Sequence, residues 1–190
     1  MIAYEYISNI PNPSVLVYDL NELPYYRIPD APEMMTATTV LVRLLDGLGF
    51  RYRWATEGLK EVDIQFQPCD SSMKVWELLA HIHGLVLVSE GFITGSEDEK
   101  VTPVGLDERR KKTLDAIVRI REALLKLDDE YLENRMYSPP WDKRDFPVWN
   151  LINGPLSDAL THVGQVASWR RMNGNPIPGA RVFHGEPPQE

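Results

Sequence analysis

The segment VWELLAHIHGLVLVSEGF, residues 75–92, has a clear helical period. Its apolar residues recur every three or four positions, the spacing that places them on one face of an α-helix. The predicted helix runs from about 73 to 92, and either Ser71 or Ser72 can cap its first turn. The face that points toward a protein core is formed by Val75, Leu78, Leu79, Ile82, Leu85, Val86 and Ser89.

A helix is expected before this segment and another after it. The earlier helix begins near residues 30–33, DAPE, which resemble a capping box with proline in the first turn. Gly47 and Gly49 weaken its end, and its apolar positions are Ala37, Val40, Leu41, Leu44, Leu45 and Leu48. The later helix follows Gly105 and has the clearest amphipathic pattern of the chain, formed by Leu114, Ile117, Ile120, Leu124, Leu127 and Tyr131.

A fourth helix is expected between two turns, Asn153-Gly154-Pro155 and Gly174-Asn175-Pro176. Its apolar positions are Leu156, Ala159, Leu160, Val163, Val166 and Ala167. Residues 134–149 are too rich in proline for the interior of a helix and are long enough to be a crossover connection. Four amphipathic helices without an alternating strand pattern predict an all-α fold, a four-helix bundle with a long crossover connection.

The chain is expected to form a single domain over residues 1–190, since this length can bury about 70 % of the surface of the unfolded chain. Residues 1–29 combine prolines with scattered aromatics, which predicts an extended N-terminal arm. Residues 176–190 predict a proline-rich tail that lies over the surface or frays. The acidic stretch at 97–99 predicts a loop.

The composition excludes several classes of protein. The single cysteine, Cys69, is incompatible with an internal disulfide or a cysteine-based zinc cluster and suits a reducing cytosol. A net charge of -8 argues against a phosphate-binding surface, and so against nucleic acid as a partner. No apolar run reaches the roughly 20 residues that span a membrane, and residues 1–18 lack the order of a signal peptide. We therefore expect a cytoplasmic protein.

Candidate metal ligands come from the four histidines and nearby carboxylates. His81 and His83 lie on opposite edges of the apolar face at 75–92, so only one of them can face a given neighbouring helix. Asp158 and His162 are four residues apart and share one face of the fourth helix. His81, Asp158 and His162 together would offer two imidazoles and a carboxylate to one divalent ion, such as zinc, nickel or iron, with positions open for water or substrate.

Structural roles can also explain these residues. Asp158 lies in the first turn of its helix, where the macrodipole stabilises a carboxylate without a metal. An isolated histidine at the edge of a core is commonly just hydrogen-bonded to its neighbours. Glu77 and His81 form another pair four residues apart, but the Glu-x-x-His signature of di-iron bundles does not occur. Cys69 has no basic neighbour in sequence that would favour its thiolate.

Two motifs carry a resemblance to a known family. The segment WELLAHI at 76–82, and DALTHVGQ at 158–165 followed by Arg170-Arg171 and Gly174-Asn175-Pro176, resemble the DinB/YfiT-like superfamily. This resemblance implies a four-helix bundle with a crossover topology, often homodimeric, and in many members a nickel or zinc site made by three histidines. His81 and His162 match two of these positions, and Asp158 stands where the family often has histidine.

The resemblance leaves two functional hypotheses. The first is a metal-dependent thiol transferase or hydrolase, in which the ion activates a low-molecular-weight thiol or water toward a small-molecule substrate. The second is a non-catalytic homodimeric binding or interaction module with a degenerate metal site. A carboxylate retained at position 158 favours the enzyme, and neither hypothesis assigns a catalytic residue beyond the metal ligands.

Overall fold

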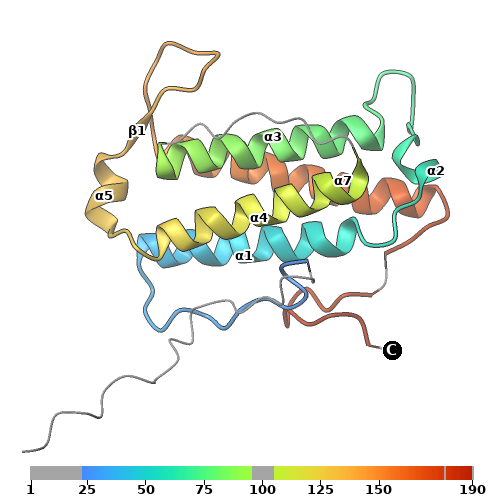
Figure 1. Ribbon diagram of the computed structural model, residues 1–190, viewed down its shortest axis with the longest axis horizontal. Coiled ribbons are helices and arrows are strands. Elements are labelled where there is room, and N and C mark those ends of the chain that lie inside the picture. The colour runs from blue at the N-terminus through green and yellow to red at the C-terminus, as the bar shows by residue number, and fades with distance from the viewer. Residues whose placement is uncertain (1–22, 96–104, 178, 190) are drawn as a thin grey trace, which may run out of the picture.

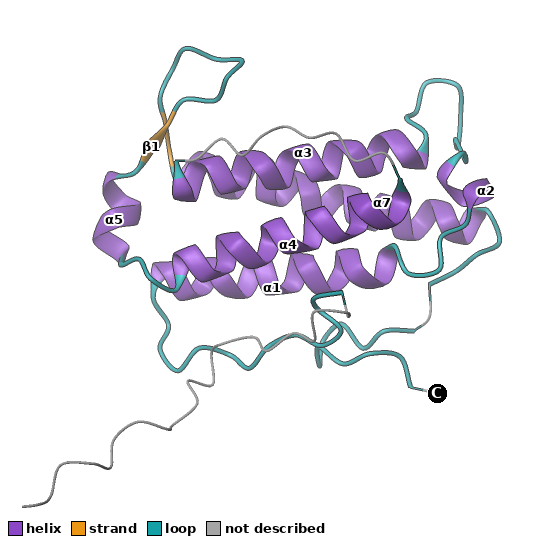
Figure 2. Cartoon of the chain, viewed as in Figure 1, coloured by secondary structure: helices purple, strands orange, loops and turns teal. Residues whose placement is uncertain are grey.

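Four long helices form the protein, as described by a computed structural model for residues 23–95, 105–177 and 179–189. They are α1 (Ala37–Ala55), α3 (Val75–Thr94), α4 (Leu106–Leu124) and α7 (Ser157–Met172) (Figure 1). Figure 2 shows that helices make up nearly all of the regular structure. The predicted all-α, four-helix-bundle fold is confirmed.

The order of the helices in the bundle differs from a simple up-down-up-down arrangement. α3 and α4 pack on each other, α1 packs on α4 and α7, and α3 packs on α7, so that α1 and α3 lie on one diagonal. His83 and Glu90 of α3 bond to Thr113 and Arg119 of α4, respectively. The residue numbers of both helices therefore increase in the same direction. These two neighbours are therefore parallel, while α1 and α7 run the opposite way (Figure 1).

The connection from α4 to α7 crosses a diagonal of the bundle, as the predicted crossover requires. It contains α5 (Asp129–Asn134), the two-residue antiparallel strands β1 (Met136–Tyr137) and β2 (Phe146–Pro147), and α6 (Trp149–Leu151). A single turn of π-helix, η1 (Ile152–Leu156), leads into α7. The α1 to α3 connection holds the short helix α2 (Glu61–Ile64). The sequence pattern did not predict the strands, because each is only two residues long.

The predicted limits of the first helix are wrong at both ends. α1 begins at Ala37, where Thr36 forms the capping box with Thr39, and Asp129 of α5 accepts hydrogen bonds from the first free backbone amides. It continues through the two glycines to Ala55. At Gly49 a Cβ atom would lie 2.5 Å from ring atoms of Tyr25, so this glycine permits a close approach and does not end the helix.

The predicted cap of α3 and the predicted end of α4 are also wrong. α3 is capped by Glu77, whose side chain accepts from the backbone amide of Lys74 at 2.8 Å, and not by Ser71 or Ser72. α4 ends at Leu124, while the apolar residues that follow it pack on the core from the next loop and from α5. For α4 the apolar spacing ran on beyond the helix because Leu127 in the loop and Tyr131 in α5 pack on the core as well.

Buried ion pairs and caps hold the helices in register. Asp46 of α1 and Arg121 of α4 form a fully buried pair, with Nε and Oδ1 2.9 Å apart. Arg170 of α7 is buried and donates to the carbonyl oxygen of Ala55 at the end of α1. The guanidinium thus satisfies a carbonyl that α1 leaves free.

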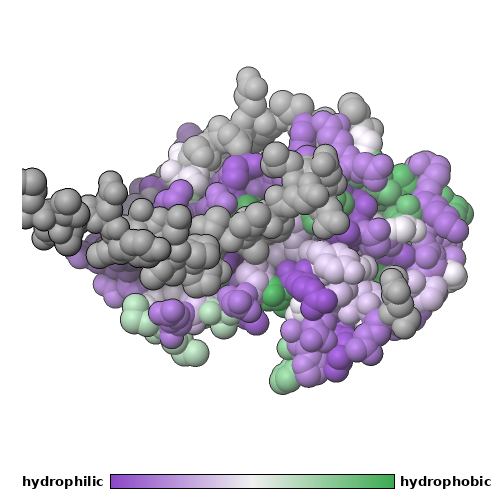
Figure 3. Space-filling model, turned by 60° about the horizontal axis from the view of Figure 1, so that its bottom comes forward, coloured by the Kyte–Doolittle hydropathy of each residue, from purple (hydrophilic) through white to green (hydrophobic). Residues whose placement is uncertain are grey.

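Residues 23–29 and the described part of the tail lie together on one side of the bundle (Figure 1). Residues 23–29 form no helix, and the amide of Ile28 donates to the carbonyl of Gly185 in the tail. The part of the predicted arm at 1–22 and the predicted loop at 97–99 lie outside the described residues. Most of the described surface in Figure 3 is hydrophilic. Within the described ranges, none of the helices has both the length and the apolar character needed to cross a bilayer.

Candidate metal centre

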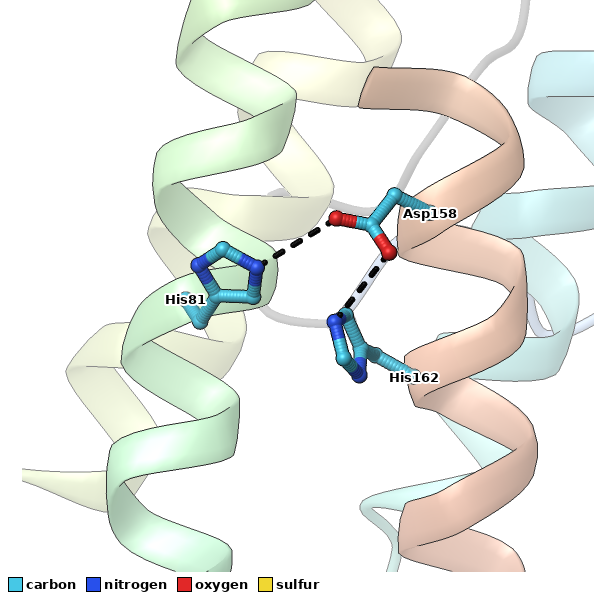
Figure 4. A group of neighbouring side chains, drawn as sticks. All are labelled: His81, Asp158 and His162. Carbon is cyan, nitrogen blue, oxygen red and sulfur yellow. Dashed lines mark ion pairs between the residues drawn. The ribbon is translucent and has the colours of Figure 1, made fainter. Parts of the chain in front are cut away.

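Three side chains from two helices meet at the contact between α3 and α7 (Figure 4). His81 extends from α3, and Asp158 and His162 extend from successive turns of α7. One carboxylate oxygen of Asp158 lies 3.4 Å from Nε2 of His81, and the other lies 3.2 Å from Nε2 of His162. One potential donor atom from each residue falls within 4.8 Å of the other two. The structure thus brings together the three residues that the sequence singled out.

The fold also separates the two histidines of α3. His83 points to α4, where its Nδ1 lies 3.0 Å from Oγ1 of Thr113 in the buried interior. Burial, together with the positive charges of Arg109, Lys112 and Arg119, lowers the pKa of His83 to about 4. This imidazole is therefore neutral near pH 7 and belongs to the core, so His83 does not replace His81 at the site.

His162 is oriented by a residue on its own helix. Oε1 of Gln165, three positions further along α7, lies 2.7 Å from Nδ1 of His162. With an amide oxygen as acceptor, the Nδ1–H group donates, and Nε2 is directed toward Asp158. Histidines that bind metals commonly have such a hydrogen bond on the ring nitrogen that does not face the ion. The sequence signal for this contact is the i, i+3 spacing of His162 and Gln165, which places both side chains on one face of the helix.

The start of α7 departs from regular helical geometry. Gly154 in η1 has φ -93° and ψ -110°, and Pro155 follows it, so the chain enters α7 through a kink. The hydroxyl of Ser157 donates to the carbonyl of Ile152 at 2.6 Å and closes the widened turn. π-Helical turns of this kind are frequent at functional sites. Here the turn places Asp158 in the first turn of α7, where the helix dipole favours a negative charge.

The geometry and chemistry of the three side chains fit a single divalent ion. Two donors bonded to zinc at about 2.1 Å in a tetrahedron lie roughly 3.4 Å apart, close to the two separations of 3.4 and 3.2 Å. Two imidazoles and one carboxylate suit zinc, nickel or iron. The side chains of His81 and Asp158 are 39 % and 46 % exposed, which leaves an open side for a further ligand.

The other candidate residues do not join this cluster. Glu77 is engaged as the cap of α3, and His184 lies in the tail against the ring of Phe183. Cys69 is exposed, and hydrogen bonds with Ser71 and Ser72 lower the pKa of its thiol although no basic residue lies beside it in sequence. Across the described parts of the chain, no other three such side chains converge in this way.

The arrangement of helices is that of the DinB-like proteins, as the sequence motifs predicted. The chain is similar to the crystal structure of a DinB-like protein, YjoA, from Bacillus subtilis, with a TM-score of 0.59 and 18 % sequence identity. The match covers 77 % of this chain and 99 % of that one. No protein-family model matches the sequence, and neither does a curated protein. The DinB-like fold is established by this likeness in structure.

Proposed function

We propose that the protein is a metal-dependent enzyme of the DinB-like fold that uses one divalent ion, nickel, zinc or iron. The observation that carries the proposal is the convergence of His81, Asp158 and His162, from helices that are far apart in sequence, at separations suited to one ion. Three protein ligands and an open side are typical of catalytic sites, whereas structural sites are closed by a fourth protein ligand.

The chemistry would be the activation of a small nucleophile. A divalent ion lowers the pKa of a water or thiol that it binds, so that attack becomes possible at neutral pH. The two imidazoles would serve as ligands in their neutral form, and Gln165 would hold His162 in the required tautomer. Asp158 would offset one positive charge of the ion. We propose transfer to a low-molecular-weight thiol or hydrolysis of a small molecule as the reaction.

A second candidate function rests on the ion pairs themselves. Asp158 lies within 3.4 Å of both imidazoles, so contacts among these three side chains can tie α3 to α7 without a metal. In that case the protein would be a non-catalytic homodimeric module, and metal would be irrelevant to its folding and interactions. The two proposals differ in whether the purified protein binds metal.

Elemental analysis of tag-free protein purified without chelator tests the first proposal. We expect about one equivalent of nickel, zinc or iron in the wild type, and less than a tenth of that in His81→Ala, Asp158→Ala and His162→Ala variants of unchanged helicity. His184→Ala is the matched control, since it removes a histidine outside the cluster and should keep the ion. Wild-type protein that holds no metal after incubation with each ion would overturn the enzyme proposal and favour the module.

A further inference from the structure

A cavity of about 550 Å³, widely open to solvent, adjoins the candidate metal centre. It lies between α3, the kinked entry into α7 and the crossover connection, and Asp158 forms part of its wall. Cavities of this size hold drug-sized molecules. Because Asp158 belongs to both the cavity and the cluster in Figure 4, a molecule in the cavity would lie beside the ion.

The lining of the cavity is mainly apolar. Leu85 and Val88 contribute from α3, Pro155 contributes from the kink, and Trp141 contributes from the connection between β1 and β2. Leu85 is one helical turn beyond His81 on α3, so the apolar wall begins next to the proposed ligand. Trp141 is 69 % exposed, which leaves its ring available for stacking on a molecule in the cavity.

The polar groups of the lining are few and mostly neutral. Ser157 and Thr161 supply hydroxyls and Asn153 supplies an amide, all of them solvent-exposed. Asp158 is the one charged residue among the described residues that line the cavity. A phosphate or carboxylate substrate would be expected to meet a lysine or arginine, and the lining formed by the described residues offers neither.

We propose that this cavity binds the planar, apolar part of an uncharged small molecule whose polar head reaches the metal centre. The inference rests on the proposed metal-dependent function and assigns the substrate class of that site. Trp141 is a specificity residue in this assignment, since it would stack on the apolar part and touch no group that reacts.

The test compares two hydroxamates on zinc-loaded protein. Acetohydroxamate and benzohydroxamate carry the same chelating head, and only the second carries an aromatic ring. By calorimetry we expect benzohydroxamate to bind the wild type about tenfold more tightly, because its ring is buried in the cavity. Trp141→Ala should reduce the ratio of the two affinities to about one third of its wild-type value or less, and Trp141→Phe should retain most of that ratio.

The chain offers a matched control. Trp149 is 76 % exposed in the same crossover connection but does not line the cavity, so Trp149→Ala should leave the ratio of the two affinities unchanged. Equal affinities in the wild type, or an equal effect of Trp141→Ala and Trp149→Ala, would overturn the substrate assignment while zinc binding stood. Failure of the wild type to hold zinc would instead overturn the proposed function, and this inference with it.

Discussion

Asp158 carries most of the difference between this site and the three-histidine sites implied by the family resemblance. Its two carboxylate oxygens face His81 and His162 separately, at 3.4 and 3.2 Å. A histidine at this position would give a neutral ligand with one donor atom facing the ion, whereas the carboxylate brings a negative charge and two oxygens. With the proposed ion bound, the exchange would favour metals that accept oxygen ligands.

Gln165 gives a prediction about the orientation of a ligand. Gln165→Leu removes the acceptor at Nδ1 of His162, so the imidazole is free to change tautomer and rotate. We expect zinc affinity to fall by about 10- to 100-fold with unchanged stoichiometry, measured by competition with a chromogenic chelator. Gln165→Glu, which keeps an acceptor oxygen, should retain most of the affinity. A Gln165→Leu variant that binds zinc like the wild type would show that this hydrogen bond does not orient the ligand.

His83 gives a prediction about stability and pH. Its pKa is about 4 in the folded protein and 6.5 in the unfolded chain, so the unfolded state takes up the proton first as the pH falls. The stability that the neutral imidazole contributes is therefore complete above pH 6.5 and declines between 6.5 and 4, by about 3 kcal/mol. His83→Gln keeps a polar group near Thr113 without this titration.

Urea unfolding at several pH values measures the difference between the two proteins. The wild type should lose about 3 kcal/mol more than His83→Gln on going from pH 7 to pH 4. Burial raises the pKa of Asp46 to about 6 and gives a pH dependence of opposite sign, but both proteins contain Asp46 and its effect cancels in the difference. Parallel curves of stability against pH would contradict the lowered pKa of His83.

At the scale of helices, the apolar spacing located all four bundle helices but not their ends. The ends depend on caps that come from other parts of the chain, such as Asp129 at the start of α1 and Arg170 at its end. A glycine in sequence suggests a helix end, yet Gly49 lies inside α1. A glycine is needed there because the ring of Tyr25 occupies the space that a side chain would take. That packing joins residues distant in sequence, so local patterns do not predict it.

Gly49 therefore gives a prediction for α1. In Gly49→Ala the new methyl group would lie 2.5 Å from the Tyr25 ring, and we expect a loss of about 1–3 kcal/mol in the free energy of unfolding, measured by urea denaturation. The control is Gly84→Ala in α3, where the added Cβ has no atom within 4 Å. The control should gain up to about 1 kcal/mol from helix propensity. A stabilising Gly49→Ala change would show that the ring does not pack on this glycine.

At the scale of the whole molecule, ion pairs tie the bundle together across helices. Asp46 and Arg121 join α1 to α4, and Glu90 and Arg119 join α3 to α4 with two hydrogen bonds, of 2.6 and 2.9 Å. A short hairpin connection would make the consecutive helices α3 and α4 antiparallel. The pairs between specific residues of α3 and α4 favour the parallel arrangement instead. Helical periodicity carries no information about this choice.

The buried pair of α1 and α4 gives the corresponding prediction. Arg121→Met leaves the carboxylate of Asp46 buried beside an apolar side chain, and we expect it to cost about 3–5 kcal/mol of unfolding free energy. Asp46→Leu combined with Arg121→Met removes both charges and should cost much less than the two single changes added together. Additive losses in chemical denaturation would mean that the two side chains contribute independently.

Much of the candidate site could be predicted because its residues lie on regular helices. The spacing of Asp158 and His162 follows from the pitch of α7, and His81 was placed at an edge of the α3 stripe by the same rule. The choice of His81 over His83 required knowing which neighbour lies on which side of α3. The role of Gln165 needed the rotamers of two side chains, and the kink before Asp158 needed the backbone angles of Gly154.

The sequence by itself determined the fold class, the four apolar faces and the three candidate metal ligands. These properties depend on the fixed geometry of the α-helix, which local spacing reports directly. The tertiary structure alone decided the parallel contact of α3 and α4, the helix ends, the core position of His83 and the cavity beside Asp158. These depend on contacts between residues distant in sequence, whose energies appear only when the helices pack.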